Sequence, residues 1–472
     1  MTSLTPKNHS RVLGSGGIPD VIQSSAPRRI WGWFFFDWAS QPYNTLLLTF
    51  IFGPYINELL GDGSRAQATW GFGIGAAGLV MALLAPVLGA IADSTGTRMR
   101  WIWLFSVMYV IGAAGIWIAA PGDMNLLIVM VFFAIGLIGM EFATIFTNAM
   151  LPDLGTPEQI GRLSGNGWAF GYVGGLFALV IFLLFFAENA ETGRTLIGLP
   201  PAFGLDPLAR EGTRFVGPYA ALWFIVFMIP FFLWVREPRP QRSEPGAVRR
   251  AMVALGRNLK TLPKDRSLFA YLLSSMFYRD ALNGMYVFGG IYAAGVLGWS
   301  AQDTGIFGIL AIISGAVFAW LGGGWDQRLG SKPVITGSII LLMVVSVGII
   351  FVTPTAVFGM PVAEGSALPN IAFYVLGAAI GAGGGTLQAS SRTMLVRQVD
   401  PAQMTTGFGL YALTGKATSF IAPLSIGLVT SLTGSQQLGI TPLVVLFVIG
   451  FVLMFWVKPA RGTEDAPPAL SA

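Results

Sequence analysis

Apolar stretches that are long enough to cross a membrane alternate with short polar segments along most of the chain. The first six lie near residues 30–59, 68–92, 101–120, 124–150, 164–187 and 215–235. The second six lie near residues 267–297, 302–325, 333–353, 370–393, 405–431 and 437–457. A helix of about 20 apolar residues spans the hydrocarbon core of a bilayer. The pattern therefore predicts an all-α membrane protein with twelve transmembrane helices.

A polar stretch separates the two sets of apolar segments and carries nine Lys and Arg residues. We interpret it as a basic cytoplasmic linker that includes an amphipathic surface helix around residues 246–262. The predicted organisation is a cytoplasmic N-terminal tail (1–29), an N-terminal six-helix bundle (30–235), the linker (236–266), a C-terminal six-helix bundle (267–457) and a cytoplasmic C-terminal tail (458–472).

The two halves share a sequence repeat with an offset of 244 residues. Both copies lie where a fourth span ends and a fifth begins. Met150-Leu151, Pro157, Gln159 and Gly165 recur as Met394-Leu395, Pro401, Gln403 and Gly409. Parallel six-helix repeats, related by an axis normal to the membrane, are a transporter architecture. The repeat predicts two pseudo-symmetric six-helix bundles around a central cavity.

The composition supports a membrane protein and excludes several kinds of chemistry. Hydrophobic residues make up 54% of the chain and charged residues 11%, whereas soluble domains are about 25% charged. The absence of cysteine excludes disulfides and thiol catalysis, and the only histidine, His9, lies in the polar N-terminal tail. We therefore expect no catalytic residues, no metal and no cofactor, and a protein that is not an enzyme.

The net charge of +5 is explained by topology, and we expect no nucleic-acid partner. The membrane side that holds both tails and the linker carries 22 of the 28 Lys and Arg residues. By the positive-inside rule, both termini lie in the cytoplasm. Residues 1–27 contain no apolar leader segment, so we expect a multi-pass protein of the cell (inner) membrane, acting as a monomer.

A short turn of similar composition follows the second span of each half. The first reads Gly89-Ala-Ile-Ala-Asp93-Ser-Thr-Gly96-Thr-Arg98-Met-Arg100, and the second reads Gly322-Gly-Gly-Trp-Asp326-Gln-Arg328-Leu-Gly330-Ser-Lys332. An Asp beside cations can tie neighbouring helices together through charge-assisted hydrogen bonds that break and re-form. We predict a cytoplasmic gate made of Asp93, Arg98, Arg100, Asp326 and Arg328.

The first turn resembles the G-x-L-A-D-R-x-G-R-K signature loop of the major facilitator superfamily, with Ser94 and Thr97 in place of two cations. Nearly the whole chain resembles the vacuole-effluxer-like, or "unknown major facilitator", family. The motifs are Asp37-Trp38-Ala39 with Tyr43, Asn148-x-x-Leu151-Pro152-Asp153, Gly167-Trp168-x-x-Gly171-Tyr172, Gln388-Ala389-x-Ser391-Arg392, Phe408-Gly409-x-Tyr411, Gly415-Lys416 and Pro423. Gln41 and Pro42 depart from the D-W-A-N-S-x-Y pattern of the family. The resemblance implies secondary export or uptake of small solutes; amino-acid efflux from the vacuole is the role attached to its fungal members.

Few polar residues lie deep in the predicted spans, and ionisable groups at such depth are candidates for function. Three carboxylates could carry protons or form ion pairs (Asp37, Glu141, Asp280), and two cations could contact anionic groups (Arg279, Lys416). The side chains that could form hydrogen bonds with a solute are those of Gln41, Asn44, Tyr278, Asn283, Gln388 and Tyr411. Together these residues make up the predicted substrate and ion pathway.

Structural roles compete with functional ones at the charged positions. Asp37 could carry protons or be a static partner to a cation or a helix end, and the two readings are about equally favoured. Glu141 is expected to pair with Lys416 or Arg279. Lys416 could instead pair with Asp280 or contact a substrate. Asp280 lies 243 residues after Asp37, which favours near-equivalent positions on the first helix of each half.

Two other features are interpreted as packing. Pro42 leaves the Trp38 carbonyl without its helical partner, and a packing kink is favoured over a carbonyl that binds solute. The glycine runs Gly71, Gly73, Gly75, Gly78 and Gly381, Gly383, Gly384, Gly385 lie in apolar helices and allow close helix contact.

The sequence thus predicts secondary active transport by alternating access. We expect a symporter or antiporter that is coupled to protons and moves a small polar or zwitterionic solute, with amino acids as a candidate class. The expected partners are the solute, protons and the lipid bilayer. The alternative is a non-transporting membrane sensor or assembly subunit on the same fold.

Overall fold

The computed structural model describes residues 27–94, 98–122, 124–155, 157–236, 262–399 and 404–459, with short pieces between 246 and 260. Eight of the 17 residues of the predicted surface helix around 246–262 therefore lie outside the described residues, and helix is described at 249–250, 252–253, 256–257 and 260. The repeat residues Pro401 and Gln403 and the side chain of Asp93 also lie outside the described residues.

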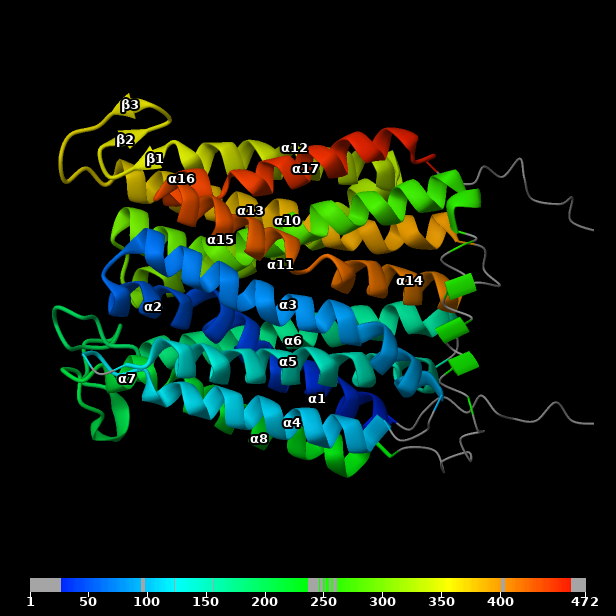
Figure 1. Cartoon of the computed structure of the whole chain (residues 1–472), viewed down its shortest axis with the longest axis horizontal. Helices are drawn as coiled ribbons and strands as arrows, with labels where there is room; N and C mark the ends of the chain where they lie inside the picture. The colour runs from blue at the N-terminus through cyan, green and yellow to red at the C-terminus, as the bar shows by residue number, and fades with distance from the viewer. Residues whose placement is uncertain are drawn as a thin grey trace, which may run out of the picture.

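Long helices run side by side along one axis (Figure 1). The first half contains α1 (Pro27–Pro42), a π-helical stretch η1 (Tyr43–Phe50), α2 (Phe52–Leu60), α3 (Gly63–Ser94), α4 (Arg98–Gly115), η2 (Ile116–Ile118), α5 (Leu126–Asn148), η3 (Leu151–Asp153), α6 (Pro157–Phe185), η4 (Ala202–Gly204), α7 (Glu211–Arg214) and α8 (Val216–Trp234). The second half contains η5 (Leu262–Lys264), α10 (Arg266–Leu297), α11 (Ala301–Leu329), α12 (Ser331–Ile350), β1 (Val352–Thr353), β2 (Ala356–Val357), β3 (Met360–Pro361), α13 (Leu368–Gln398), α14 (Met404–Ala417), α15 (Ile421–Thr433), α16 (Gln436–Gly439), α17 (Thr441–Leu453) and η7 (Met454–Trp456).

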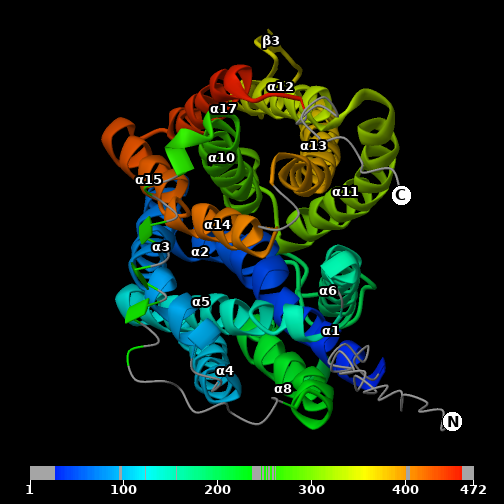
Figure 2. The ribbon, with the colours of Figure 1, turned by 90° about the vertical axis from the view of Figure 1, so that its right-hand side faces the viewer.

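The helices form two groups when the bundle is seen end-on (Figure 2). Helices α1 to α8 make one group and α10 to α17 the other. They meet where α3 packs on α14 and α15, where α6 packs on α11, and where α2 packs on α10. The predicted arrangement of two six-helix bundles is confirmed.

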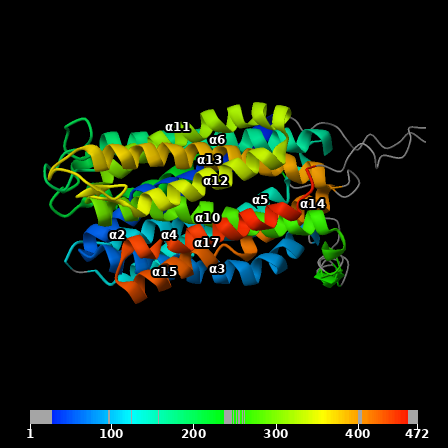
Figure 3. The same cartoon turned by 90° about the horizontal axis from the view of Figure 1, so that it is seen from above.

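The two ends of the bundle differ, and we name them by what they carry. The terminal end holds the start of α1 and the end of η7 (Figure 1). The loop end holds strands β1 to β3 and the loop of residues 186–210 (Figure 3). The strands were not predicted. Each is two residues long, too short to produce a strand pattern, and the turn before β3 has Gly359 at φ +79°.

Ten helical segments among the described residues are long and apolar enough to cross a membrane. The two predicted spans that miss this criterion are the first of each half. Span 1 is divided among α1, η1 and α2, and span 7 (α10) is interrupted by polar residues. These two spans carry the predicted carboxylates Asp37 and Asp280, so polarity is concentrated at equivalent places in the repeat.

Span 11 is also divided, although the sequence predicts one helix over 405–431. Helix α14 ends at Ala417 and α15 begins at Ile421. Pro423 lies in the first turn of α15, where a proline is tolerated, but it could not continue a helix that began in α14. The Ile421 amide bonds instead to the Thr418 carbonyl at 2.8 Å, which closes a tight turn between the two helices.

The halves are held together at the loop end by neutral polar contacts. Gln67 is fully buried, and its Nε2 donates to Thr430 Oγ1 at 2.8 Å and to the Gln436 carbonyl at 3.1 Å. A Cβ at Gly71 would lie 2.7 Å from the Cα of Gly427, so α3 and α15 touch through their backbones. The predicted packing role of the glycine run in span 2 is confirmed.

Candidate functional site

Pro42 ends α1, and the carbonyl that it frees has a partner. The Nε1 of Trp223, on α8, donates to the Trp38 carbonyl at 3.1 Å, and the two indoles stack with centroids 6.1 Å apart. That carbonyl is therefore engaged within the first half. The favoured interpretation of Pro42 as a packing kink agrees with this contact.

Asp37 lies against a glycine face of α6. A Cβ at Gly167 would lie 3.0 Å from Asp37 Oδ2, and a Cβ at Gly171 would lie 3.0 Å from Asp37 Cβ. One turn further, a Cβ at Gly175 would lie 2.7 Å from Gln41 Cγ. Small residues at this spacing let two membrane helices approach closely. The predicted polar face of span 1 thus packs on span 5.

Asn44 continues this face but points to another helix. Its Nδ2 lies 3.8 Å from the sulfur of Met140 on α5. Asn44 follows Asp37 by two helical turns, and the π-helical stretch after Pro42 shifts its direction. The three polar residues of span 1 therefore divide between α6 and α5.

Glu141 and Lys416 form an ion pair between the halves. Glu141 lies on α5 and Lys416 near the end of α14, and the Lys416 ammonium contacts Glu141 Oε2 directly. Both side chains are partly accessible, at 19% and 32%. Of the two expected partners, Lys416 and Arg279, Glu141 pairs with Lys416. Within a membrane bundle, the attraction between the two charges offsets the desolvation cost of both side chains.

Arg279 lies on α10 and packs on α14 of its own half. Its guanidinium lies 4.2 Å from the ring centroid of Tyr411, and Nη1 donates to the Tyr411 carbonyl at 3.0 Å. A Cβ at Gly415 would lie 2.6 Å from Arg279 Nη2. Arg279 thus fills the notch between residues 411 and 415.

This notch reveals a charge inversion between the repeats. Tyr411 and Gly415 follow Gly167 and Gly171 by the repeat offset of 244 residues. Arg279 therefore has, in the second half, the place that Asp37 has in the first. The sequence predicted Asp280 as the counterpart of Asp37, and the contacts correct this by one residue. Neighbouring residues on a helix point about 100° apart, so Arg279 and Asp280 face different neighbours. The residue that matches Asp37 is therefore a cation instead of a carboxylate.

Asp280 is buried elsewhere, at the break in span 11. Its side chain is only 3% exposed, and Oδ2 accepts a hydrogen bond from the Ala422 amide at 2.9 Å. Its Oδ1 is buried without a hydrogen-bond partner among the described residues. Asp280 forms no ion pair with Lys416, which pairs with Glu141.

The remaining predicted hydrogen-bonding residues have different surroundings. Tyr278 is fully buried, and its hydroxyl pairs with Ser391 Oγ at 2.8 Å, so it is held inside the second half. Gln388 Nε2 lies 3.5 Å from the Tyr286 hydroxyl. Asn283 is exposed one helical turn after Arg279. Asn283 is thus exposed in this conformation, whereas Tyr278 is buried.

Each of the two predicted gate turns holds an ion pair with a residue from another span. The side chain of Asp93, which was predicted to take part in the first turn, lies outside the described residues. Arg98 pairs with Asp153 at the end of span 4, with Nη1 and Oδ2 2.6 Å apart. Arg100 is exposed. Because Asp153 lies two spans further along the chain, the turn itself did not reveal it.

The second turn uses the C-terminal end of α13. Asp326 is buried, and its Oδ1 lies 3.0 Å from Nη2 of Arg397 and 2.8 Å from Ser331 Oγ. The predicted gate residue Arg328 is exposed. Arg397 follows Asp153 by 244 residues, so these two equivalent positions again carry opposite charges.

Arg392 is a candidate that the sequence analysis missed. Its guanidinium, on α13, lies 5.1 Å from the ring centroid of Trp168 on α6. The contact joins the halves between spans 10 and 5, as the Glu141–Lys416 pair joins spans 4 and 11. The place of Arg392 beside Ser391 in a family motif was the available signal.

A charged cluster at the loop end was also missed. Arg210 binds both carboxylate oxygens of Glu58, at 2.6 and 2.7 Å, and lies 3.0 Å from Glu188 Oε1. Glu188 is buried, and burial raises the pKa of its carboxyl from 4.5 to about 7 despite the attraction of Arg210. These residues come from three segments, so no local motif could show the cluster.

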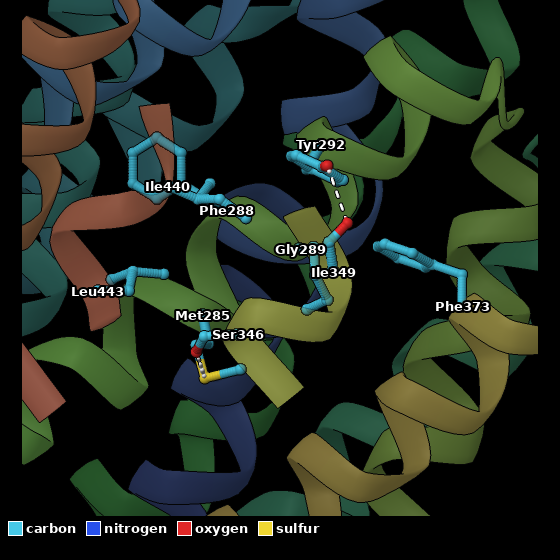
Figure 4. A pocket seen from close by; sticks show the side chains of 9 residues that line it. All are labelled: Met285, Phe288, Gly289, Tyr292, Ser346, Ile349, Phe373, Ile440 and Leu443. Atoms are coloured by element: carbon cyan, nitrogen blue, oxygen red, sulfur yellow. Dashed lines mark hydrogen bonds between the residues drawn. The ribbon is translucent and has the colours of Figure 1, made fainter. Parts of the chain in front are cut away.

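One cavity lies within the second half, away from these charges (Figure 4). Apolar side chains of α10, α12, α13 and α17 line it, including Phe288, Ile349 and Phe373. Its volume of about 20 Å³ is close to the space that one water molecule needs. The predicted central cavity between the halves stays a prediction.

Comparison with solved structures supports the fold. A bacterial homologue of the human lysosomal transporter Spinster, in an inward-facing and occupied conformation, matches with a TM-score of 0.62 at 17% identity, over 91% of this chain and 97% of that one. A D-xylose-proton symporter matches with a TM-score of 0.61 at 13% identity, over 92% and 97% of the two chains. Identities this low show a shared fold.

Relatives match along much of the sequence. The uncharacterized MFS-type transporter YxiO of Bacillus subtilis is 25% identical over 437 residues, which are 92% of this chain and 95% of YxiO. Autophagy-related protein 22 of Cryptococcus neoformans is 26% identical over 313 residues, 65% of this chain. The chain spans about half the length of this fungal relative, 52%.

The profile of a single family covers most of the described helices. It is described as "Vacuole effluxer Atg22 like" and matches residues 70–467. The match includes the predicted membrane residues Glu141, Asp280 and Lys416. The chain belongs to the vacuole effluxer Atg22-like family, within the major facilitator fold.

Proposed function

We propose that the chain is a secondary active transporter that moves a small polar or zwitterionic solute by alternating access. The Glu141–Lys416 ion pair carries this proposal, because it joins two pseudo-symmetric halves inside the membrane bundle. A rocking transporter needs contacts between its halves that can break and re-form. A partly accessible ion pair meets this need, since water can solvate both charges when they separate.

The distribution of contacts supports alternation between two states. The loop end is joined by neutral hydrogen bonds, which include Thr304 Oγ1 to the Phe50 carbonyl at 2.8 Å and Gln302 Nε2 to the Ala187 carbonyl at 3.0 Å. Towards the terminal end, the contacts between halves involve charges, Lys416 with Glu141 and Arg392 over Trp168. We propose that one set separates while the other holds.

The charge inversion supports a zwitterionic solute. Asp37 offers a carboxylate in the first half, and Arg279 offers a guanidinium at the matching position of the second. An ammonium and a carboxylate on one small molecule would complement these two groups. Amino acids are the simplest such class. The family description as vacuole effluxers agrees with export of a small solute.

We further propose that transport is coupled to protons, as symport or antiport. Asp37, Glu141 and Asp280 are the membrane carboxylates that could carry them. The described turns at Arg98 and Asp326 act as gate elements on the cytoplasmic side, with the terminal end facing the cytoplasm. The protein works as a monomer in the cell membrane.

Reconstitution into liposomes tests the proposal. We expect that purified protein exchanges a labelled amino-acid mixture by counterflow and that an imposed pH gradient drives net uptake. Asp37→Asn and Lys416→Ala should reduce exchange at least about tenfold, because each removes a charge that faces the solute or the gate. Arg328→Ala, which changes an exposed cation, serves as the matched control.

A non-transporting sensor or assembly subunit is the competing reading of the same fold. It predicts that no member of a broad solute panel moves across the liposome membrane. It also predicts that the Asp37→Asn and Lys416→Ala cells keep unchanged uptake profiles. These results together would contradict the transport proposal.

A further inference from the structure

The break in span 11 creates a helix end inside the second half. Helix α15 is 13 residues long and begins at Ile421, and the chain before it turns away from the direction of α14 (Figure 1). The first amides of a helix have no partner within it, and the helix dipole favours negative charge there. Asp280, from α10, supplies that charge by accepting from the Ala422 amide at 2.9 Å.

Only one of the two carboxylate oxygens is satisfied. Asp280 Oδ1 is buried and has no hydrogen-bond partner among the described residues, and the side chain as a whole is 3% exposed. An unpartnered oxygen on a buried carboxylate is costly while the group is charged. Taking up a proton at Oδ1 removes that charge and leaves Oδ2 free to keep the Ala422 amide.

The neighbouring charges do not compensate Asp280. On α14, Lys416 is paired with Glu141 and Tyr411 with Arg279. On its own helix the adjacent groups are Tyr278, which bonds to Ser391 Oγ, and the same Arg279.

Among the other helices packed on α10, α2 and α13 carry charges that are engaged elsewhere: Glu58 binds Arg210, Arg392 lies over Trp168, and Arg397 pairs with Asp326. Helices α15 and α17 contain no titratable residue, and those of α3 lie only near its ends, at Arg65 and Asp93. Among the described residues, Asp280 is therefore a buried carboxylate that accepts one hydrogen bond, from a neutral amide.

We propose that Asp280 is the proton-coupling site of the transport cycle and that it acts on the hinge between α14 and α15. The proposal rests on the transport function proposed above. A proton from water binds Oδ1 with formation of an O–H bond, and the carboxylate becomes a neutral carboxyl group. The neutral group keeps the Ala422 amide but loses the attraction between its negative charge and the dipole of α15, which loosens the hinge.

The hinge leads directly to the contact between the halves. Lys416 lies one residue before the end of α14, and the break follows at Thr418 to Phe420. A change in the angle between α14 and α15 therefore moves the ammonium that holds Glu141. The proton leaves Oδ1 for water on the opposite side once the halves have changed conformation. Asp280 thereby links proton binding to the Glu141–Lys416 ion pair without touching the solute.

Spin-label distances test this without knowledge of the solute. The chain has no cysteine, so Asn148→Cys and Thr393→Cys place one label on α5 and one on α13, both at exposed positions. In lipid nanodiscs we expect two distance populations whose ratio changes about tenfold between acidic and alkaline pH, within the usual range of coupling between sites. In Asp280→Asn the ratio should not depend on pH. Asn keeps an oxygen for the Ala422 amide, so the helix cap remains.

Controls separate Asp280 from the other groups that titrate. Glu188→Gln removes the buried carboxylate of the loop end and should leave the pH response intact. A pH response that persists in Asp280→Asn, or a ratio that never changes in the parent protein, would overturn the proposal. If Asp280→Asn does not fold, infrared difference spectra of the combined Asp37→Asn, Glu141→Gln and Glu188→Gln protein decide. A protonated carboxyl band must still appear on acidification, and its loss would overturn the assignment.

Transport measurements distinguish failure of this inference from failure of the transport function. If Asp280→Asn retains counterflow but loses accumulation driven by a pH gradient, both proposals hold. If it accumulates solute as well as the parent protein, the inference fails while transport stands. If the parent protein moves no solute, transport fails, and the distance measurements still decide whether a proton at Asp280 moves the hinge.

Discussion

Glu141 and Lys416 lie 275 residues apart in the chain and form a direct ion pair between span 4 of one half and span 11 of the other. The pair is a charged contact between the two repeats within the membrane bundle. Lys416 lies beside the break in span 11, so the strength of the pair depends on the geometry of that hinge as well as on the two charges.

A double-mutant cycle measures the interaction. Lys416→Ala should lower thermal stability, because it leaves the Glu141 carboxylate without its cation, and should lower it less when Glu141→Gln is also present. We expect a coupling energy of roughly 0.5–3 kcal/mol between contacting residues. Melting temperatures of the four proteins in one detergent provide the measurement. Additive losses would show that the two side chains do not interact.

The second gate turn makes a prediction that separates Arg397 from Arg328. Asp326→Asn removes the buried carboxylate that binds Arg397 at 3.0 Å and Ser331 at 2.8 Å. We expect a loss of about 1–3 kcal/mol in unfolding free energy, since a buried charge-assisted contact is lost. Arg328→Ala should cost less than about 0.5 kcal/mol, because Arg328 is exposed. Equal losses for the two variants would contradict the pairing with Arg397.

The glycine face of α6 predicts a steric effect. A Cβ at Gly171 would lie 3.0 Å from Asp37 Cβ, whereas a Cβ at Gly165 would meet nothing within 4 Å. Gly171→Ala should therefore destabilise the protein by about 1–3 kcal/mol through overpacking, and Gly165→Ala should be neutral or slightly stabilising. Thermal unfolding compares the two. A neutral Gly171→Ala would mean that spans 1 and 5 are not in close contact.

The kink at Pro42 predicts an interaction with Trp223. Trp223→Phe removes the donor to the Trp38 carbonyl, so a buried acceptor loses its partner at a cost of about 1–3 kcal/mol. In a Pro42→Ala background, residue 42 regains an N–H that can bond to the same carbonyl. The cost of Trp223→Phe should then fall by at least half. An unchanged cost would show that the indole acts only through its ring contacts.

Glu188 predicts a pH dependence that arises outside the membrane-spanning helices. Burial raises the pKa of Glu188 from 4.5 to about 7, so the folded protein binds this proton more tightly than the unfolded chain. Stability should therefore fall as the pH rises from about 4.5 to about 7, by at most roughly 3 kcal/mol. Glu188→Gln should flatten this slope in thermal unfolding measured across the range. A slope of unchanged size in that variant would assign it to other groups.

The sequence by itself determined the membrane class, the number of spans and the repeat. The length of an apolar segment decides whether it crosses a bilayer. Lipid offers no hydrogen-bond partners, so the backbone groups of such a segment must bond to each other within a helix. The offset of 244 residues is a property of the chain alone. The prediction that Glu141 pairs with a cation also follows from one-dimensional reasoning, since a buried charge needs a partner.

The tertiary structure decided which partner each charged group has and which face it occupies. Asp326 pairs with Arg397 and Arg98 with Asp153, across spans that local motifs do not connect. Arg279, rather than Asp280, takes the place of Asp37, because a one-residue shift rotates a side chain by about 100° around a helix. The break before α15, with Asp280 at its start, depends on α10 and α15 meeting in space. Hydropathy reports the depth of a residue in the membrane, while the packing of the helices sets its neighbours.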